Sequence, residues 1–335
     1  MILTLVGVSQ GMLDDQARRT RGVGADVIIR APDSSAIALT NGFKAKFIDF
    51  VGKQPHVALA TGALVVPTGP LTSITGLDVD AFVRMSGPFR FLSGGAIVGD
   101  RDVIVDEYYA RQHALHIGDT IRILNVPWRV SGIFEQGRLA RIVVRLGVLQ
   151  DLTDNSGKIS VIYAKLDDSA RTQEVIDWLK AKGMKDYKIW SLEELISQFA
   201  VNNVPMLKEF IYVVVGVGVV VGFLVVFLSM YMAVLERTRE IGVLKALGAS
   251  PGFILNLLLR ESALLSVVGS AIGILMTYGT RWLIGVLMPS ALVESIVPLW
   301  WPIAAAISLL GSLLGAAYPG LKAARQDAIE ALSYD

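Results

Sequence analysis

The chain has 335 residues and a net charge of +1; 53% of its residues are apolar and only 18% are charged. Soluble domains carry about 25% charged residues, whereas here residues 14–209 hold 24 of the 31 Lys and Arg and 23 of the 30 Asp and Glu. This distribution excludes a single soluble enzyme and predicts a water-soluble domain joined to a membrane domain. The near-zero net charge gives no electrostatic footprint for nucleic acid, and the absence of cysteine excludes disulfides, thiolate nucleophiles and zinc–thiolate sites.

The chain begins with an apolar stretch, residues 1–13, that is too short to cross a membrane by itself. A bilayer core of about 30 Å needs roughly 20 helical residues, and 13 residues reach only about 20 Å. No positive residues precede the stretch and no small-residue cleavage site follows it, as they would in a signal peptide. We interpret it as a partial first transmembrane helix and expect the native polypeptide to start upstream of Met1.

Residues 14–200 are predicted to form a large split α/β domain. Two strand–helix–strand halves lie at residues 26–70 and 158–190. The stretch between them, residues 71–157, is rich in Gly, Val and Ile and contains several turn signals, which predicts a β-rich insertion. The expected strands are 25–30, 56–66, 159–166 and 187–190, and the expected helices are 43–51 and 169–182.

A capping box follows the second half, with Ser191 as the N-cap and Glu194 three residues later. The apolar positions after it have helical spacing and run toward the next apolar stretch. We therefore expect a near-continuous helix that joins the domain to the second span, with a kink at Pro205.

Residues 201–335 contain three stretches long enough to cross a membrane: 210–235, 263–288 and 297–321. Trp300, Trp301 and Tyr318 lie near the ends of the last stretch, as interfacial aromatic residues do. Arg281 lies near the end of the middle stretch, where its side chain can extend to the interface.

Charges in the short connections predict the orientation of these spans. The 289–296 turn has Glu294 and neither Lys nor Arg. Positive residues instead follow the first and last of the three spans, at Arg237, Arg239, Lys245, Arg260, Lys322 and Arg325. Residues 236–260 and the C-terminus should therefore face the cytoplasm, and residues 14–209 should be extracytoplasmic.

Two other patterns are weak indications of chemistry. Residues 92–95, L-S-G-G, match the start of the signature loop of ATP-binding cassettes, but the chain has no GxxxxGK[ST] loop, so we expect an ordinary turn. His113 and His116 have a spacing that can place them on one face, but no further ligands are evident, so we expect surface histidines and no metal site. No nucleophile motif is present, and we expect no catalytic activity.

Each full span contains a GxxxG pair: Gly218 and Gly222, Gly269 and Gly273, and Gly311 and Gly315. Small residues allow helix backbones to approach closely. The sequence leaves open whether these glycines pack helices within one subunit or between two subunits.

The most specific stretch is residues 236–250, E-R-T-R-E-I-G-V-L-K-A-L-G-A-S. Its charges predict a polar helix that continues the preceding span into the cytoplasm. Gly248 is expected to end that helix, with Ser250 as the next N-cap and Pro251 in the first turn of the following helix. On physical grounds alone, the stretch can equally be an ordinary solvated exit helix.

With Glu261 downstream, this stretch resembles the hallmark of the FtsX-like permease domain of MacB-type ABC transporter permeases. Residues 318–325 and 328–332 resemble the C-terminal end of that family. Residues 103–110, 117–120 and 128–133 resemble the extracytoplasmic core domain of the family. Residues 7–12 and 22–26 resemble the exit from its first span. The resemblance covers essentially the whole chain, with two departures. The first span is about half the usual length, and no ATPase domain is fused to the chain.

The resemblance implies an α+β membrane protein of the bacterial inner membrane. A transmembrane helix bundle, with three full spans and a truncated first span, would carry a large extracytoplasmic split α/β domain containing a β-rich insertion. Such permeases bind no cofactor themselves and pair as homo- or heterodimers. They recruit separate ABC ATPase subunits, which bind the ATP.

By the same resemblance, the ATPase would dock on the 236–250 segment, and its motion would be relayed to the outer domain for export or efflux, a process called mechanotransmission. A periplasmic adaptor would be a further partner in efflux. Lipoprotein release and transmembrane regulation of an envelope hydrolase stay open as alternative functions. The expected ATPase-coupling residues are Glu236, Arg237, Arg239, Glu240, Lys245 and Gly248.

Overall fold

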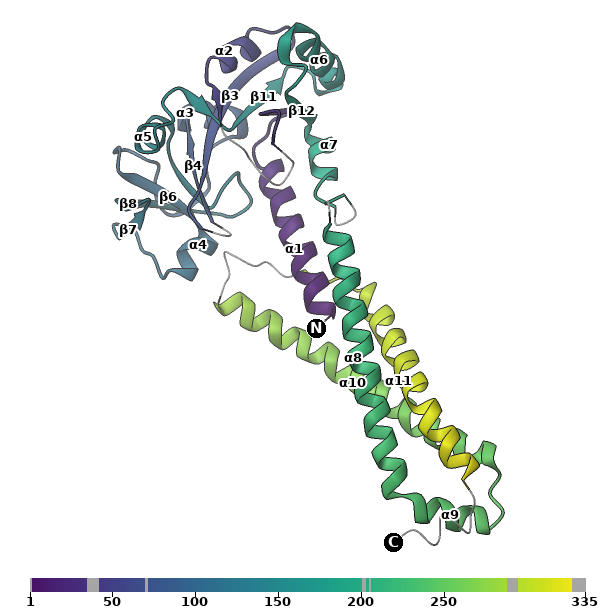
Figure 1. Cartoon of the computed structure of the whole chain (residues 1–335). Coiled ribbons are helices and arrows are strands. Elements are labelled where there is room, and N and C mark those ends of the chain that lie inside the picture. The colour runs from purple at the N-terminus through teal and green to yellow at the C-terminus, as the bar shows by residue number, and fades with distance from the viewer. Residues whose placement is uncertain are drawn as a thin grey trace. The chain divides into compact units, whose positions relative to one another are not determined.

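A computed structural model describes residues 2–34, 42–69, 72–200, 203–204, 206–287 and 295–326 (Figure 1). Contacts divide the chain into two compact units. One unit, here the helical unit, consists of residues 1–9, 206–283 and 294–335. The other, here the sheet unit, consists of residues 10–205 and 284–293.

The sheet unit is built on a mixed sheet to which ten of the described strands belong, in the order β12-β1-β11-β3-β4-β9-β6-β8-β5, with β7 paired to β8. In chain order these strands are β1 (Val27–Arg30), β3 (Val57–Pro67), β4 (Ser73–Leu77), β5 (Phe91–Gly94), β6 (Asp102–Asp106), β7 (Thr120–Ile123), β8 (Val126–Phe134), β9 (Ile142–Arg145), β11 (Val161–Leu166) and β12 (Lys188–Ser191). A separate two-stranded sheet pairs β2 (Phe43–Lys44) with β10 (Lys158–Ile159).

The predicted β-rich insertion continues the sheet of the two halves. Strand β3 pairs on one side with β11 and on the other with β4, both antiparallel. The pairs β4–β9 and β6–β8 are parallel. One sheet therefore runs from the halves into residues 71–157, because β3 is long enough to serve both.

Two apolar cores lie along this sheet. The first gathers residues of the two halves, including Ile29, Ile162 and Leu179. The second gathers residues 64–152, including the fully buried Trp128. Strand residues fill these cores from alternating positions. The helices of this unit are α2 (Phe47–Gly52), α3 (Val79–Ser86), α4 (Glu107–Gln112), α5 (Leu146–Leu152) and α6 (Thr172–Leu179), with a 3₁₀ turn η1 (Ser169–Arg171) and a π turn η2 (Lys180–Met184) beside α6.

Helix α1 (Ile2–Arg21) continues well past the apolar stretch expected to end at residue 13. Within the sheet unit, its residues Leu13, Ala17 and Thr20 are buried, and so is the charged Asp15. The second half of α1 is therefore an integral part of that unit.

The capping box is confirmed, because the backbone N–H of Glu194 donates to Ser191 Oγ at 3.0 Å and opens helix α7 (Leu192–Ser197). The expected near-continuous helix to the second span is wrong. Helix α7 ends after six residues, where Asn203 Nδ2 donates to the carbonyl oxygen of Ser197 at 2.7 Å. Met206, before the next helix, has φ +63°, which no continuous helix contains. Pro205 lies outside the described residues.

The helical unit contains three helices long and apolar enough to cross a membrane: α8 (Leu207–Glu236), α10 (Pro251–Leu287) and α11 (Trp300–Arg325). They correspond to the three predicted spans. A short helix, α9 (Thr238–Ala246), connects the first two of them. Glu294 and residues 328–332, used in the sequence argument, lie outside the described residues.

Candidate functional site

The stretch with the sequence motif folds as two helices with a break at Arg237. Helix α8 ends at Glu236, Arg237 has φ −100° and ψ 15°, and α9 then begins at Thr238. The hydroxyl of buried Thr238 lies 3.0 Å from the carbonyl oxygen of Val234 and 2.9 Å from that of Leu235. The Thr238 hydroxyl thus satisfies two carbonyl oxygens at the end of α8, and a new helix starts there. The expectation of one polar helix that continues the span is therefore wrong.

Polar contacts fasten α9 to the neighbouring helices. Arg237 Nη1 lies 3.1 Å from Oε1 of Glu261 on α10. Lys245 Nζ donates to the carbonyl oxygen of Gln326, directly after α11. Two of the expected coupling residues are thus used inside this chain.

The buried side of α9 is apolar. Ile241 is buried in a core to which α8, α9, α10 and α11 all contribute residues. Gly242, next to it in the chain, is also buried. The other buried members of this core are Met230, Val234, Ile254, Leu258, Ala316, Ala323 and Ala324. Helix α9 is therefore packed against the long helices and is not a free extension of α8.

The opposite side of α9 is exposed and carries both charge and apolar surface. Glu236, Arg239 and Glu240 are exposed. Val243 is 46% exposed and Leu247 is 80% exposed, one helical turn apart. These two apolar residues were not predicted from the sequence, although their four-residue spacing, on the side opposite Ile241, is a signal that could have identified them.

A Schellman turn ends α9. The N–H of Gly248 donates to the carbonyl of Lys245 at 2.9 Å, and the N–H of Ala249 donates to that of Leu244 at 3.0 Å. Gly248 has φ +93°, which glycine adopts without the penalty of a Cβ. Ser250 Oγ then accepts from the N–H of Phe253 at 3.3 Å, and Pro251 opens α10. The three turn residues have the positions that the sequence predicted for them.

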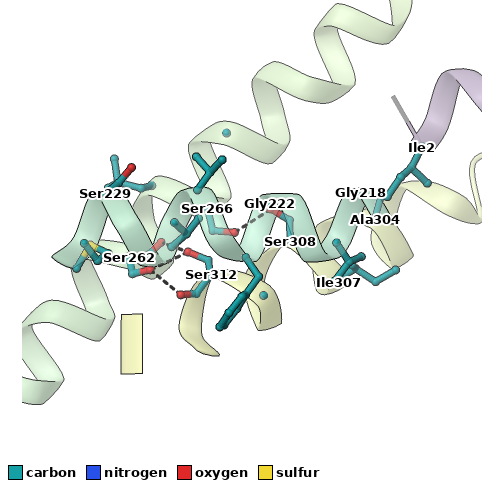
Figure 2. A pocket seen from close by; sticks show the side chains of 18 residues that line it. Ile2, Gly218, Gly222, Ser229, Ser262, Ser266, Ala304, Ile307, Ser308 and Ser312 are labelled. Atoms are coloured by element: carbon teal, nitrogen blue, oxygen red, sulfur yellow. Dashed lines mark hydrogen bonds between the residues drawn. The ribbon is translucent and has the colours of Figure 1, made fainter. Parts of the chain in front are cut away.

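A cavity of about 460 Å³ lies among α8, α10 and α11. Four of the predicted glycines line it, Gly218, Gly222, Gly269 and Gly311, as do five serines. Figure 2 shows two serine pairs that join α10 to α11: Ser262 Oγ lies 2.7 Å from Ser312 Oγ, and Ser266 Oγ lies 3.2 Å from Ser308 Oγ. The serines thus satisfy one another across an otherwise apolar helix pair.

The six GxxxG glycines do not share one role. A Cβ on Gly315 would lie 3.2 Å from the carbonyl oxygen of Phe223 and 3.2 Å from Val226 Cγ1, so this glycine permits the close approach of α11 to α8. A Cβ on Gly222, Gly269, Gly273 or Gly311 would meet nothing within 4 Å. Packing within the chain therefore accounts for Gly315, while these four glycines border open space.

The weak motifs have structural roles. The turn expected at the L-S-G-G stretch is wrong, because its residues 92–94 lie in strand β5, which pairs with β8. A Cβ on Gly94 would lie only 2.3 Å from the carbonyl oxygen of Ser131, so the glycine is needed for strand packing. The ring of His113 packs against that of Tyr109 with centroids 4.4 Å apart and an interplanar angle of 43°, and His116 Nδ1 lies 3.7 Å from Asp119 Oδ2. The described residues contain no group of three or more potential metal ligands.

Family models match both parts of the chain. A model described as MacB-like periplasmic core domain matches residues 1–182. A model described as FtsX-like permease C-terminal matches residues 212–328. The two matches fall on the sheet-containing part and on the long helices, respectively.

Curated relatives agree with these matches. The chain is 24% identical over 376 aligned positions to "Macrolide export ATP-binding/permease protein MacB" of Escherichia coli, covering 99% of this chain and 56% of that protein. It is 28% identical over 226 positions to "Uncharacterized ABC transporter permease YknZ" of Bacillus subtilis, covering 65% and 55%. The chain thus spans about half the length of these relatives.

Two solved structures with similarity to the chain are described as a periplasmic region and an extracellular domain. The periplasmic region of MacB from Actinobacillus actinomycetemcomitans is 17% identical, with a TM-score of 0.39, and the match covers 52% of this chain and 92% of that one. The extracellular domain of a noncanonic ABC-type transporter, YknZ, from Gram-positive bacteria is 12% identical, with a TM-score of 0.38, covering 50% and 98%.

Proposed function

Because the chain belongs to the MacB/FtsX family of ABC transporter permeases, we propose that it relays the ATP-driven motion of a separate ATPase subunit to an extracytoplasmic domain. In this proposal the partner binds the ATP, for which it needs a GxxxxGK[ST] loop that holds the nucleotide phosphates. The sheet unit would be the extracytoplasmic domain, and α9 would face the cytoplasm, as the positive residues around it favour.

The observation that carries this proposal is the two-sided character of α9. Its inner side is buried among α8, α10 and α11, and its outer side exposes Glu240, Val243 and Leu247. A docking surface for another protein needs an apolar anchor within a polar rim. Leu247, 80% exposed at the tip of the segment, supplies the anchor.

The attachment of α9 explains how a force on it would reach the spans. The Arg237–Glu261 ion pair and the Lys245–Gln326 contact tie α9 to α10 and to the end of α11. The break at Arg237 separates α9 from α8, so a force on α9 would not be transmitted along the axis of one continuous helix. Displacement of α9 would instead move the ends of the three long helices together, because packed cores transmit strain.

The composition of the spans favours relay over passage of a polar substrate through the bundle. Residues 210–235 contain no charged side chain, and the polar groups of the cavity are serines, several of which pair with each other. Polar transport pathways generally place ionisable residues in the membrane. We therefore propose export or efflux driven by movement of the outer domain, in a pair of permease subunits and with an outer adaptor; lipoprotein release and control of an envelope hydrolase are the alternative outcomes.

The experiment is affinity purification of the tagged full-length protein from its native membrane, followed by mass spectrometry. The proposal expects a protein with a GxxxxGK[ST] loop to be recovered with the wild type and to be depleted at least tenfold with Leu247→Ser. The matched control is Leu92→Ser, an equally apolar and 60% exposed residue of β5. Equal recovery with the wild type and both variants would contradict the proposed docking site. Co-recovered outer proteins would decide among adaptor, lipoprotein carrier and hydrolase.

A further inference from the structure

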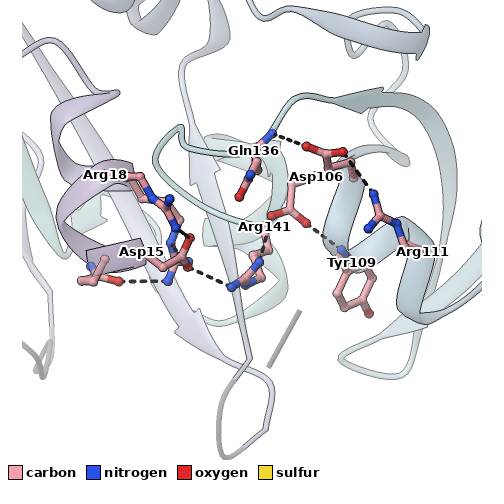
Figure 3. A network of polar contacts seen from close by, with 10 residues as sticks. Asp15, Arg18, Asp106, Tyr109, Arg111, Gln136 and Arg141 are labelled. Carbon is pink, nitrogen blue, oxygen red and sulfur yellow. Dashed lines mark hydrogen bonds and ion pairs between the residues drawn. The ribbon is translucent and has the colours of Figure 1, made fainter. Parts of the chain in front are cut away.

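Four charged side chains meet inside the sheet unit. Asp15 and Arg19 belong to α1, Asp106 ends β6, and Arg141 directly precedes β9. Arg141 lies between the two carboxylates: its Nη2 is 2.9 Å from Asp15 Oδ2 and its Nη1 is 3.1 Å from Asp106 Oδ2 (Figure 3). Arg19 Nε lies 3.2 Å from Asp15 Oδ2. The side chains of Asp15, Asp106 and Arg141 are only 3%, 2% and 9% exposed.

Backbone contacts support the same junction. The N–H of Leu139 donates to the carbonyl oxygen of Arg19 at 3.1 Å. A Cβ on Gly22 would lie 2.0 Å from the carbonyl oxygen of Gly137, so the chain after α1 passes directly against the segment that leads to Arg141. On the strand side, the N–H of Asp106 donates to the carbonyl oxygen of Arg141 at 2.8 Å, and Asp106 Oδ1 accepts from the N–H of Tyr109 at 2.7 Å.

Buried ion pairs add little net stability, but separation of the two partners is strongly unfavourable. Desolvation of the charges offsets most of their attraction, whereas separating buried partners leaves uncompensated charge and is strongly unfavourable. Burial raises the pKa of Asp106 to about 6, although the positive charge of Arg141 acts in the opposite direction and favours the ionised carboxylate. If α1 slid or rotated by one residue, Asp15 would move away from Arg141 and leave a buried charge without its partner. Apolar contacts alone would allow such a movement, whereas this cluster opposes it.

We propose that the cluster of Asp15, Arg19, Asp106 and Arg141 is a joint that fixes residues 10–21 of α1 to β6 and β9 in a single position. The joint stands independently of the proposed function. Its use, as the point where motion of α1 enters the sheet, rests on that function. Through the joint, a displacement of α1 would be passed to β6 and β9 rather than absorbed by slippage along the apolar face formed by Leu13 and Ala17.

Hydrogen exchange measured by mass spectrometry on the full chain in detergent tests the joint without any ATPase. The variant is Asp15→Asn, which removes the charge that faces Arg141. The matched control is Asp14→Asn, because Asp14 is exposed and, within the described part of the chain, its carboxylate accepts a hydrogen bond from Gln10 of the same helix at 2.9 Å. We expect Asp15→Asn to accelerate exchange across residues 10–21 at least tenfold, while amides of β1 and β11 keep the wild-type rate.

A second, milder variant tests the same cluster from the side of Arg141. Arg141→Lys keeps the positive charge but offers a point charge in place of the planar fork that reaches both carboxylates, so it should accelerate exchange in residues 10–21 to a lesser extent. The joint is overturned if Asp15→Asn exchanges like Asp14→Asn. It is equally overturned if either cluster variant accelerates exchange by the same factor in β1 and β11, since that result means a general loss of stability. Because no partner is present, either result leaves the proposed function untouched.

Discussion

Arg237 Nη1 lies 3.1 Å from Glu261 Oε1, so the residue at the break between α8 and α9 is paired with α10 inside the same chain. Both residues belong to the motif that marks the family resemblance. The contact holds α9 against α10, while the side chain of Arg237 stays 53% exposed. The surface left for a partner is the exposed face that carries Glu240, Val243 and Leu247.

Loss of this ion pair should affect docking more than stability. Both side chains are partly exposed, and such pairs contribute less than about 1 kcal/mol. We expect Glu261→Gln to leave the thermal midpoint nearly unchanged and to reduce stimulation of the ATPase by no more than about fivefold, and the charge swap Arg237→Glu with Glu261→Arg to restore it. Stimulation assays with Glu209→Gln as the control check this; an unrestored swap would show that the pair does not position α9.

Gly248 and Gly252 should respond oppositely to alanine. Gly248 has φ +93°, where a Cβ is unfavourable by about 1–2 kcal/mol. Gly252 lies in the first turn of α10 with open space around its Cβ position, where alanine should stabilise by up to about 1 kcal/mol. Thermal unfolding of Gly248→Ala and Gly252→Ala in the same detergent measures both. A Gly248→Ala protein as stable as the wild type would disprove the role of the turn.

Gly315 and Gly311 offer a second matched pair. Leucine at position 315 would collide with the backbone of α8 near Phe223, so we expect a destabilisation of about 1–3 kcal/mol. Leucine at position 311 enters the cavity, and the stability of the single chain should be unchanged. Unfolding midpoints of the two variants check the difference, and equal midpoints would mean that α11 does not approach α8 as described.

Asp106 predicts a specific pH dependence of stability. Burial raises its pKa from 3.8 to about 6, against the lowering effect of Arg141 and Arg19 and with a small raising effect of Asp15. A raised pKa in the folded state contributes stability that is present below the unfolded pKa and is lost as pH rises through about 6. Between pH 5 and pH 7.5, the wild type should therefore lose about 1 kcal/mol relative to Asp106→Asn.

Denaturant unfolding of the two proteins at both pH values measures this difference. Asp151→Asn serves as the control, because Asp151 is an exposed residue that contacts Ser156. A constant difference between the wild type and Asp106→Asn across this range would show that Asp106 titrates at its ordinary pKa.

The sequence predicted features that depend on local chemistry. The turn at Gly248, the caps at Ser191 and Ser250, the three long helices and most strands follow from propensity, capping and hydropathy along the chain. The break at Arg237 and the early end of α7 were not predicted, because side chains of Thr238 and Asn203 satisfy backbone groups in competition with the helix.

Long-range features could not be read from spacing at all. Asp15, Asp106 and Arg141 are ordinary surface-type residues in the sequence, and only the sheet order brings them together. The continuation of one sheet through the expected insertion likewise depends on which strands pair with β3. The exposure of Leu247 also depends on which side of α9 packs against the other helices.

The central claim is that the exposed face of α9 receives the ATPase, and one measurement tests it most directly. The full-length permease and its cassette ATPase are combined in nanodiscs, and ATPase binding and stimulation are measured for the wild type, Glu240→Lys and Leu247→Ser. The matched controls are Glu193→Lys, at an exposed position on α7, and Leu92→Ser on β5. Both variants on the exposed face of α9 are expected to lose at least tenfold in affinity, which corresponds to about 1.4 kcal/mol or more, while both controls behave like the wild type. Unchanged binding and stimulation in both α9 variants would contradict it and would make α9 a solvated exit from the membrane.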